Sequence, residues 1–219
     1  MPRILVTASS HPELAGKPNG TYLPELTHAL HVFEERALPY VIATPKGGAL
    51  PGYGHDADAL TRDMLARDDF AAAIAETRGL DTIDAAEFDA VFFPGGYGLL
   101  FDLVDDERVH TLVRAFHERG APIAAVCHGP AALVRVRDAD GRALIHGRRT
   151  SGFTREEEVA MDTLGHIPFV LEEALVDAGA IYEKRARWQP HVVVDGLWIT
   201  GQNPASAAGV GEALARALG

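Results

Sequence analysis

The single cysteine of the chain, Cys127, lies where a short apolar segment meets a run of small residues. In the surrounding sequence, PIAAVCHGPAAL, residues 123–126 are typical of a buried strand and a helix-like stretch begins just after Gly129. A nucleophile at such a strand-to-helix turn adopts a strained backbone conformation, so the positions two before and two after it must be small. Those positions hold Ala125 and Gly129. The spacing therefore predicts a nucleophile elbow with Cys127 at its tip.

An exposed thiol at this position could attack carbonyl carbons. The N-terminus of the following helix is expected to lower the pKa of the Cys127 thiol by stabilising the thiolate. The free backbone amide of His128 could point toward the oxyanion that develops during attack. The alternative is an inert cysteine packed at the end of a buried strand. The elbow spacing favours the reactive interpretation.

His128 is the candidate general base for this thiol, because an elbow reverses the chain and can bring neighbouring side chains into reach. A histidine in this role needs a carboxylate that fixes its tautomer. The segment GFTREEE offers Glu156, Glu157 and Glu158, and their spacing does not choose among them. At least two of the three are expected to be ordinary acidic residues in the first turn of a helix.

A second candidate element is the glycine-rich turn Pro94–Gly98, which follows an apolar strand-like segment. In open parallel sheets, the turns at the carboxyl ends of strands line the ligand crevice. Gly95 and Gly96 allow backbone amides to approach a substrate oxygen and to form the other half of an oxyanion hole. A plain tight turn and a phosphate loop are the alternatives, and the phosphate loop is disfavoured because the GxxxxGK[ST] pattern is missing.

Metal chemistry is not predicted. His28 and His31 are three residues apart on one face of an expected helix over 21–36, but no cysteine or clear third ligand accompanies them. Glu25 lies near the N-terminus of the same helix, where a carboxylate can be a simple helix-start residue.

The elements that must position these groups alternate along the chain. Short apolar segments separated by helix-like stretches predict parallel strands joined by helical crossovers, and the apolar residues on both sides of each strand place the sheet between two helical layers. A hairpin is expected around the pair Asp195-Gly196, and a last helix follows Asn203-Pro204. The expected strands are residues 4–7, 41–44, 91–93 and 123–126.

Residues 46–79 break this regular alternation. A turn-rich stretch, PKGGALPGYGHD, precedes a helix-like stretch, DADALTRDMLARDDFAAAIAET, so we expect an insertion or lid over the sheet edge. No repeat, low-complexity tract or linker is present. The economical interpretation is therefore one domain over residues 1–219.

Composition excludes several classes of function. The chain has 219 residues, is 47% hydrophobic and carries a formal net charge of -11, so no broad cationic surface exists for nucleic acid or anionic lipid. The first residues lack the long apolar stretch of a signal peptide, and no later segment reaches membrane-spanning length. A single cysteine excludes an internal disulfide. We therefore expect a cytoplasmic protein without a nucleic-acid or membrane partner.

Four motifs occur together: PGGYG, AVCHGPAAL, GFTREEE and TGQNPASA. With them, the chain resembles the ThiJ/PfpI superfamily of the class I glutamine amidotransferase-like fold over essentially its whole length. Within that superfamily it is similar to the heat-shock-protein-31-like glyoxalase III branch, which also carries an acidic residue in the first helix, FD after the glycine-rich turn and NPAS near the C-terminus. The resemblance implies a flavodoxin-like three-layer α/β sandwich and a homodimer.

The resemblance also implies roles for individual residues. Cys127 corresponds to the nucleophile and His128 to its partner, and Glu158 corresponds to the acidic member, which lies six residues after the glycine of the GF[ST] turn. Glu25 matches the carboxylate that hydrogen-bonds the reactive thiol, and Gly96 matches the backbone donor of the oxyanion hole.

One residue departs from the pattern of many relatives, which have histidine where this chain has Tyr97. The departure bears on the range of substrates more than on the type of reaction.

The implied reaction is the glutathione-independent conversion of methylglyoxal, or a similar small 2-oxoaldehyde, to a 2-hydroxy acid through a cysteine hemithioacetal. It needs no cofactor. A stress-protective chaperone or deglycase activity can accompany it. Two alternatives stay open: a cysteine-dependent amidase or peptidase, which would use the same elbow, and a non-enzymatic holdase chaperone or redox sensor, in which the cysteine is oxidised under stress.

Overall fold

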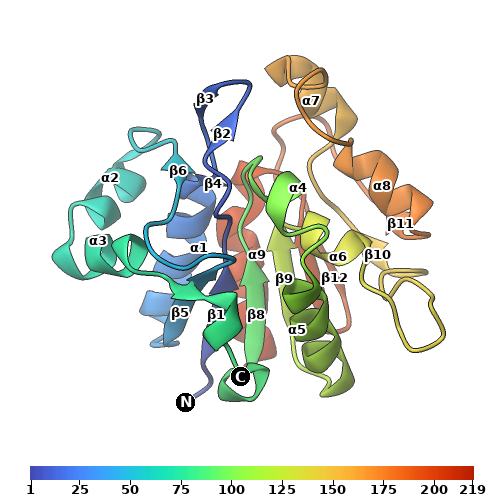
Figure 1. Ribbon diagram of the computed structural model, residues 1–219, viewed down its shortest axis with the longest axis horizontal. Helices are drawn as coiled ribbons and strands as arrows, with labels where there is room; N and C mark the ends of the chain where they lie inside the picture. The colour runs from blue at the N-terminus through green and yellow to red at the C-terminus, as the bar shows by residue number, and fades with distance from the viewer.

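A seven-stranded sheet forms the centre of the computed structural model, which describes residues 1–219 (Figure 1). Its strands are β1 (Ile4–Thr7), β5 (Tyr40–Thr44), β7 (Arg78–Gly79), β8 (Ala90–Phe93), β9 (Ile123–Val126), β12 (Val192–Asp195) and β13 (Trp198–Gly201). Their spatial order is β12-β13-β9-β8-β1-β5-β7, and only the pairing of β12 with β13 is antiparallel. The predicted α/β fold with a mostly parallel central sheet is confirmed.

Helices cover both faces of this sheet. The main ones are α1 (Leu23–Glu35) and α9 (Ala207–Ala217) on one face, and α4 (Leu99–Asp102), α5 (Glu107–Glu118), α6 (Ala131–Val134) and α8 (Leu171–Asp177) on the other. Successive residues of β8 point to opposite faces, so that Phe92 packs in the cluster with Phe33 of α1 whereas Phe93 packs in the cluster with Phe116 of α5. Both sides of each central strand are therefore buried, as the uninterrupted apolar runs predict.

The remaining elements are short. They are β2 (Glu13–Leu14), β3 (Lys17–Pro18), β4 (Thr21–Tyr22), β6 (Gly52–Tyr53), β10 (Arg149–Thr150), β11 (Ile181–Tyr182), α7 (Arg155–Met161) and the 3₁₀ turns Leu80–Thr82, Ala85–Glu87 and Pro204–Ser206. Several of them (β2, β3, β4, β6 and α7) lie above the carboxyl ends of the strands, at the top of Figure 1. Two of them position candidate site residues: β4 leads directly into α1, which carries Glu25, and α7 itself carries Glu158.

The segment 46–79 differs from the single helix that its sequence suggests. It forms two helices, α2 (Ala59–Leu65) and α3 (Asp68–Ala75), and then adds β7 to the edge of the sheet beside β5. The helices separate at Arg67, whose backbone is extended and whose guanidinium pairs with Glu34 and Asp69. The same segment contributes β6, which pairs with β4.

The predicted hairpin is present, with its turn one residue later than the sequence pattern suggested. Asp195 pairs with Trp198, so the two loop residues are Gly196 and Leu197, with Gly196 at a φ of 61°. The carboxylate of Asp195 instead accepts a hydrogen bond of 2.9 Å from the backbone amide of Arg149.

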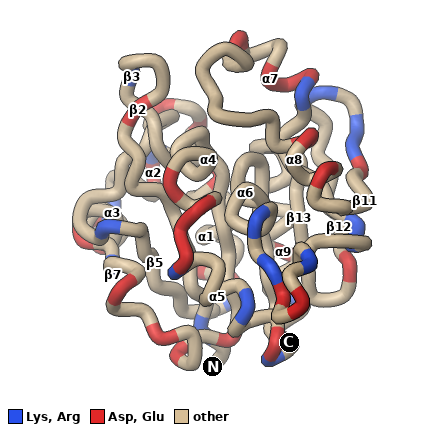
Figure 2. Tube along the Cα trace, turned by 45° about the vertical axis from the view of Figure 1, so that its right-hand side comes forward, with Lys and Arg blue, Asp and Glu red and all other residues tan.

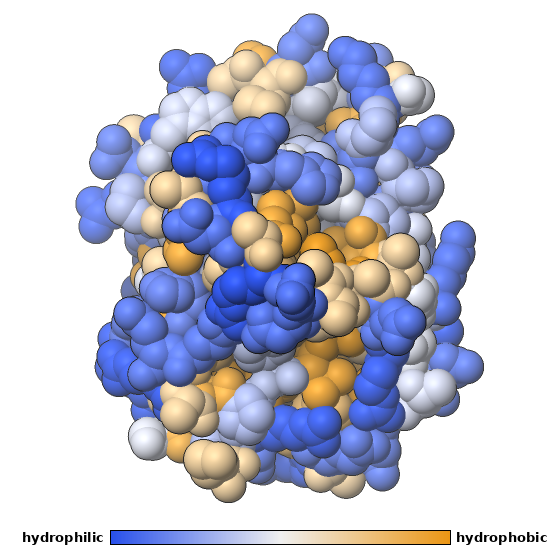
Figure 3. Space-filling model, turned by 90° about the vertical axis from the view of Figure 1, so that its left-hand side faces the viewer, coloured by the Kyte–Doolittle hydropathy of each residue, from blue (hydrophilic) through white to orange (hydrophobic).

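Charged residues lie on the outer helices and loops, as Figure 2 shows, and β1, β8, β9 and β13 contain none. The face in Figure 3 is mostly hydrophilic, with hydrophobic residues in smaller areas separated by hydrophilic ones. None of the helices combines the length and the apolar composition needed to cross a bilayer.

Candidate active site

Cys127 follows β9 directly and has a φ of 58°. This left-handed conformation is costly for any residue except glycine, so other contacts must maintain it. The amide of Cys127 donates to the carbonyl of Gly201 at 2.9 Å, and its carbonyl accepts from the amide of Phe153 at 2.9 Å. A Cβ on Gly129 would lie 2.3 Å from the carbonyl oxygen of Phe93. The strained elbow and its requirement for a small residue two positions later are thus both present.

His128 connects the thiol to a carboxylate. Its Nδ1 lies 3.5 Å from the Sγ of Cys127, and its Nε2 lies 2.7 Å from Oε1 of Glu158. The side chains of His128 and Glu158 are 1% and 0% exposed. A buried carboxylate at this distance favours a proton on Nε2 and leaves the lone pair of Nδ1 directed toward the thiol.

A second layer of hydroxyl groups fixes Glu158. The hydroxyl of Thr163 donates to Oε2 of Glu158, and the hydroxyl of Tyr97 donates to Thr163 at 3.3 Å. The Tyr97 ring also lies 4.5 Å from the imidazole of His128, measured between ring centroids. Tyr97 therefore packs against His128 directly and reaches Glu158 through Thr163, a role that the sequence pattern did not reveal.

The three consecutive glutamates have three different environments. Glu156 is exposed and pairs with Lys184 at 3.1 Å, as expected for a residue on the solvated side of a helix. Glu157 forms a capping box with Thr154 at the N-terminus of α7 and is fully buried. Glu158 alone contacts His128. The structure thus identifies Glu158 as the glutamate beside His128, which the spacing leaves open. It also shows that Glu157 has buried contacts that an ordinary acidic residue in a first helical turn lacks.

Glu25 is completely buried in the first turn of α1, beside Cys127 and Gly95. Neither carboxyl oxygen has a hydrogen bond of regular geometry within the protein. Burial raises the pKa of Glu25 to about 8, although the Cys127 thiol and the Gly95 amide act in the opposite direction. Near neutral pH a large fraction of Glu25 is therefore protonated.

The expected lowering of the thiol pKa is wrong for the resting site. Burial raises the pKa of Cys127 well above its ordinary value, and the negative charge of Glu25 adds to this effect. The following helix, α6, has only four residues and cannot compensate. Two adjacent buried acids titrate as a pair, so thiolate formation at Cys127 depends on Glu25 keeping its proton.

The raised pKa of Glu25 predicts an effect of pH on the stability of the protein. The pKa of Glu25 rises from 4.5 to about 8 on folding, so the folded state binds more protons across this interval. The free energy of unfolding contributed by Glu25 is therefore fully present below pH 4.5 and is lost as the pH rises through 8. Urea unfolding at several pH values should show that Glu25→Gln reduces the decline in the free energy of unfolding over this interval by up to about 5 kcal/mol. Parallel pH profiles for the two proteins would contradict the assignment.

The glycine-rich turn approaches the thiol closely. A Cβ on Gly95 would lie 2.0 Å from a carboxyl oxygen of Glu25 and 2.6 Å from the Cβ of Cys127. Gly96 has a φ of 118° and packs against the backbone of Gly20 and Thr21. The backbone amides of Gly96 and His128 donate no hydrogen bond within the protein, so the oxyanion hole predicted at these two amides stays a prediction that the hydrogen bonds do not oppose.

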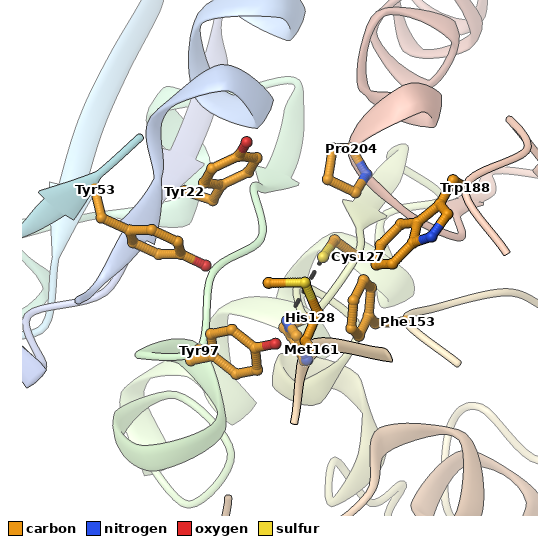
Figure 4. Close-up of a pocket in the computed structure, with 9 residues that line it drawn as sticks. All are labelled: Tyr22, Tyr53, Tyr97, Cys127, His128, Phe153, Met161, Trp188 and Pro204. Atoms are coloured by element: carbon orange, nitrogen blue, oxygen red, sulfur yellow. Dashed lines mark hydrogen bonds between the residues drawn. The ribbon is translucent and has the colours of Figure 1, made fainter. Parts of the chain in front are cut away.

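A pocket of about 250 Å³ opens onto Cys127 and His128 (Figure 4). No Lys, Arg, Asp or Glu side chain lines it. Its lining residues are Tyr22, Tyr53, Tyr97, Cys127, His128, Phe153, Met161, Trp188 and Pro204. Only Cys127, His128 and Tyr97 of this set are predicted from the sequence, because the other residues come from separate loops and short elements whose meeting point depends on the fold.

The histidines of α1 lie outside this pocket. His28 pairs with Asp58 at 3.0 Å and His31 with Glu35 at 3.6 Å. The two residues therefore have separate carboxylate partners.

Comparison with known proteins places the chain in a family. The model of the DJ-1/PfpI family matches residues 19–217. Glyoxalase 3 of Candida albicans is 26% identical over 97% of this chain and 96% of its own length, and the glutathione-independent glyoxalase HSP31 of Saccharomyces cerevisiae is 26% identical over 88% and 86%.

Among solved structures, the Rapid Encystment Protein 24 kDa of Francisella tularensis superposes with a TM-score of 0.96, at 30% identity over 100% of both chains. These matches extend over nearly the whole chain and confirm the superfamily predicted from the four motifs. The chain belongs to the DJ-1/PfpI family.

Proposed function

We propose that the protein is a glutathione-independent glyoxalase that converts methylglyoxal and similar 2-oxoaldehydes to 2-hydroxy acids, with Cys127 as the nucleophile. The observation that carries this proposal is the continuous series of contacts from Cys127 through His128 to Glu158, at the floor of a pocket without charged side chains. The names of the two yeast relatives support it.

The first step joins the thiol to the aldehyde. The Sγ of Cys127 bonds to the aldehyde carbon while Nδ1 of His128 takes the thiol proton, which lies within reach at 3.5 Å. The carbonyl oxygen becomes an oxyanion that the amides of Gly96 and His128 stabilise. Return of the proton to this oxygen gives a neutral hemithioacetal.

The second step moves a proton between adjacent carbons. Removal of the proton from the hemithioacetal carbon gives an enediolate, and protonation of the neighbouring carbon gives a thioester of a 2-hydroxy acid. Glu25 and His128 are the groups near the thiol that can carry these protons. Water then cleaves the thioester and restores the thiol. One carbon is oxidised as the other is reduced, so water is the only co-reactant.

The direct experiment incubates the purified protein with methylglyoxal in the absence of glutathione and measures lactate by chromatography. We expect lactate to appear in amounts equal to the methylglyoxal consumed. Aminoacyl anilides and glutamine serve as substrates for the competing amidase or peptidase activity. Hydrolysis of these compounds without lactate formation would replace the glyoxalase by that alternative.

A homodimeric state and a cytoplasmic location stay predictions. We propose both for the active protein, the first from the superfamily resemblance and the second from the apolar pattern of the sequence. Size-exclusion chromatography with light scattering tests the dimer.

A further inference from the structure

Trp188 is held in a backbone conformation that a bulky residue rarely adopts. It has a φ of 65°, lies in the loop between β11 and β12, and is 44% exposed. The left-handed region costs roughly 1–2 kcal/mol for a residue with a Cβ. Specific contacts must therefore maintain Trp188 in this geometry.

Glu157 supplies those contacts. Its Oε1 accepts hydrogen bonds from the amide of Trp188 at 2.9 Å, from Nδ2 of Asn203 at 2.8 Å and from Nε2 of Gln202 at 3.2 Å. Its Oε2 accepts from the amide and the hydroxyl of Thr154, at 3.0 and 2.9 Å. Hydrogen bonds to a carboxylate are stronger than those between neutral groups, and this carboxylate is fully buried. One glutamate thus fixes the Trp188 loop against the N-terminus of α7.

The indole of Trp188 forms one wall of the pocket above Cys127. Its ring lies 5.9 Å from that of Phe153, which lies 4.6 Å from the imidazole of His128. Figure 4 shows Trp188 and Phe153 on one side of the thiol, with Tyr53 on the other. A flat apolar group that enters the pocket therefore meets aromatic rings from both sides.

The size and chemistry of the pocket match an aromatic substituent. A dry apolar cavity of about 150 Å³ is large enough to bind benzene, and this pocket has about 250 Å³. The remaining space suits the two carbons of an oxoaldehyde placed at Cys127. A phosphate or carboxylate on the substrate would lose its hydration without meeting a cationic side chain, which is unfavourable.

We infer that Trp188 is a specificity-determining residue, positioned by Glu157, and that it makes the site prefer 2-oxoaldehydes with an aromatic substituent over methylglyoxal. The inference rests on the proposed glyoxalase function for its reaction. The part of the inference that concerns binding of an aromatic group rests only on the pocket.

The kinetic test compares phenylglyoxal with methylglyoxal. The wild-type protein should show a higher kcat/KM for phenylglyoxal, and Trp188→Ala should lower the ratio of the two kcat/KM values about tenfold, because aromatic contact and apolar burial are both lost. Trp188→Phe should retain most of the ratio. Leu197→Ala, which removes an exposed apolar side chain in the β12–β13 turn, is the matched control and should keep the wild-type ratio.

A second measurement does not depend on turnover. Cys127 is the only cysteine, so intact-mass spectrometry can follow its alkylation by iodoacetamide and by N-benzyliodoacetamide. The rate of alkylation by N-benzyliodoacetamide, divided by the rate with iodoacetamide, should be higher for Cys127 of the wild-type protein than for free cysteine. Trp188→Ala should remove most of this gain. If no 2-oxoaldehyde is turned over, this gain still supports the aromatic site. A wild-type preference for the small reagent, or the same ratio in Trp188→Ala, would overturn the inference.

Discussion

Cys127→Ala is expected to abolish the conversion of methylglyoxal to lactate. The chain has no second cysteine that could replace the lost thiol, so neither the hemithioacetal nor the thioester can form. Lactate formation by the variant should therefore fall below the detection limit. Chromatography of lactate measures it, at protein concentrations that give rapid turnover with the wild-type protein.

Thermal unfolding provides the control for Cys127→Ala. The alanine side chain is smaller and fits the same backbone, and the hydrogen bonds that hold the elbow are made by backbone atoms. The variant should therefore unfold cooperatively near the wild-type temperature. Lactate formation at the wild-type rate by a folded Cys127→Ala protein would eliminate the proposed mechanism.

Glu158→Gln is expected to lower kcat by about 100- to 10,000-fold, the usual contribution of a well-positioned acid or base. The carboxylate accepts from Nε2 of His128 at 2.7 Å, whereas an amide can present its NH₂ group to the ring instead. That arrangement favours the other tautomer, with the proton on Nδ1, which can no longer accept the proton of Cys127. Steady-state kinetics over a range of pH values measures this loss.

The chain contains a matched control for this substitution. Glu156→Gln removes the same charge two residues earlier on α7, but Glu156 faces solvent and pairs with Lys184. Exposed ion pairs contribute little to stability, so this variant should keep both the wild-type rate and the wild-type unfolding temperature. Equal losses in the two variants would show that the effect arises from net charge and not from the contact with His128.

The positions of four central strands and of the elbow along the chain follow from local sequence. Uninterrupted apolar runs identify β1, β5, β8 and β9, and the small residues at positions 125 and 129 identify the turn at Cys127, because each pattern reflects a steric requirement within a few residues. The order of the strands and the two helices of residues 59–75 depend on packing between distant segments. The pattern of residues in those segments is therefore insufficient to specify them.

The candidate site also combines features that follow from local sequence with features that depend on the packing of distant segments. Neighbouring residues on a helix point about 100° apart, so a run of three glutamates cannot show which one faces His128 until the helix is placed. The raised pKa of Cys127 has a similar origin, because it depends on burial and on Glu25, which lies about a hundred positions earlier in the chain. The sequence shows that three further pocket residues are aromatic, but no regular spacing indicates that they line the same pocket: Tyr22, Tyr53 and Trp188.

The adjacency of Glu157 and Glu158 restricts how this enzyme can diversify. A change that moves the first turn of α7 displaces both Glu158, the partner of the proposed general base, and the indole of Trp188, so a change in selectivity gained there should also slow the proposed reaction. The opposite wall has more freedom, because Tyr53 belongs to β6, a two-residue strand that carries none of the residues proposed to transfer protons. Mutant libraries that aim for new substrates should therefore begin at Tyr53.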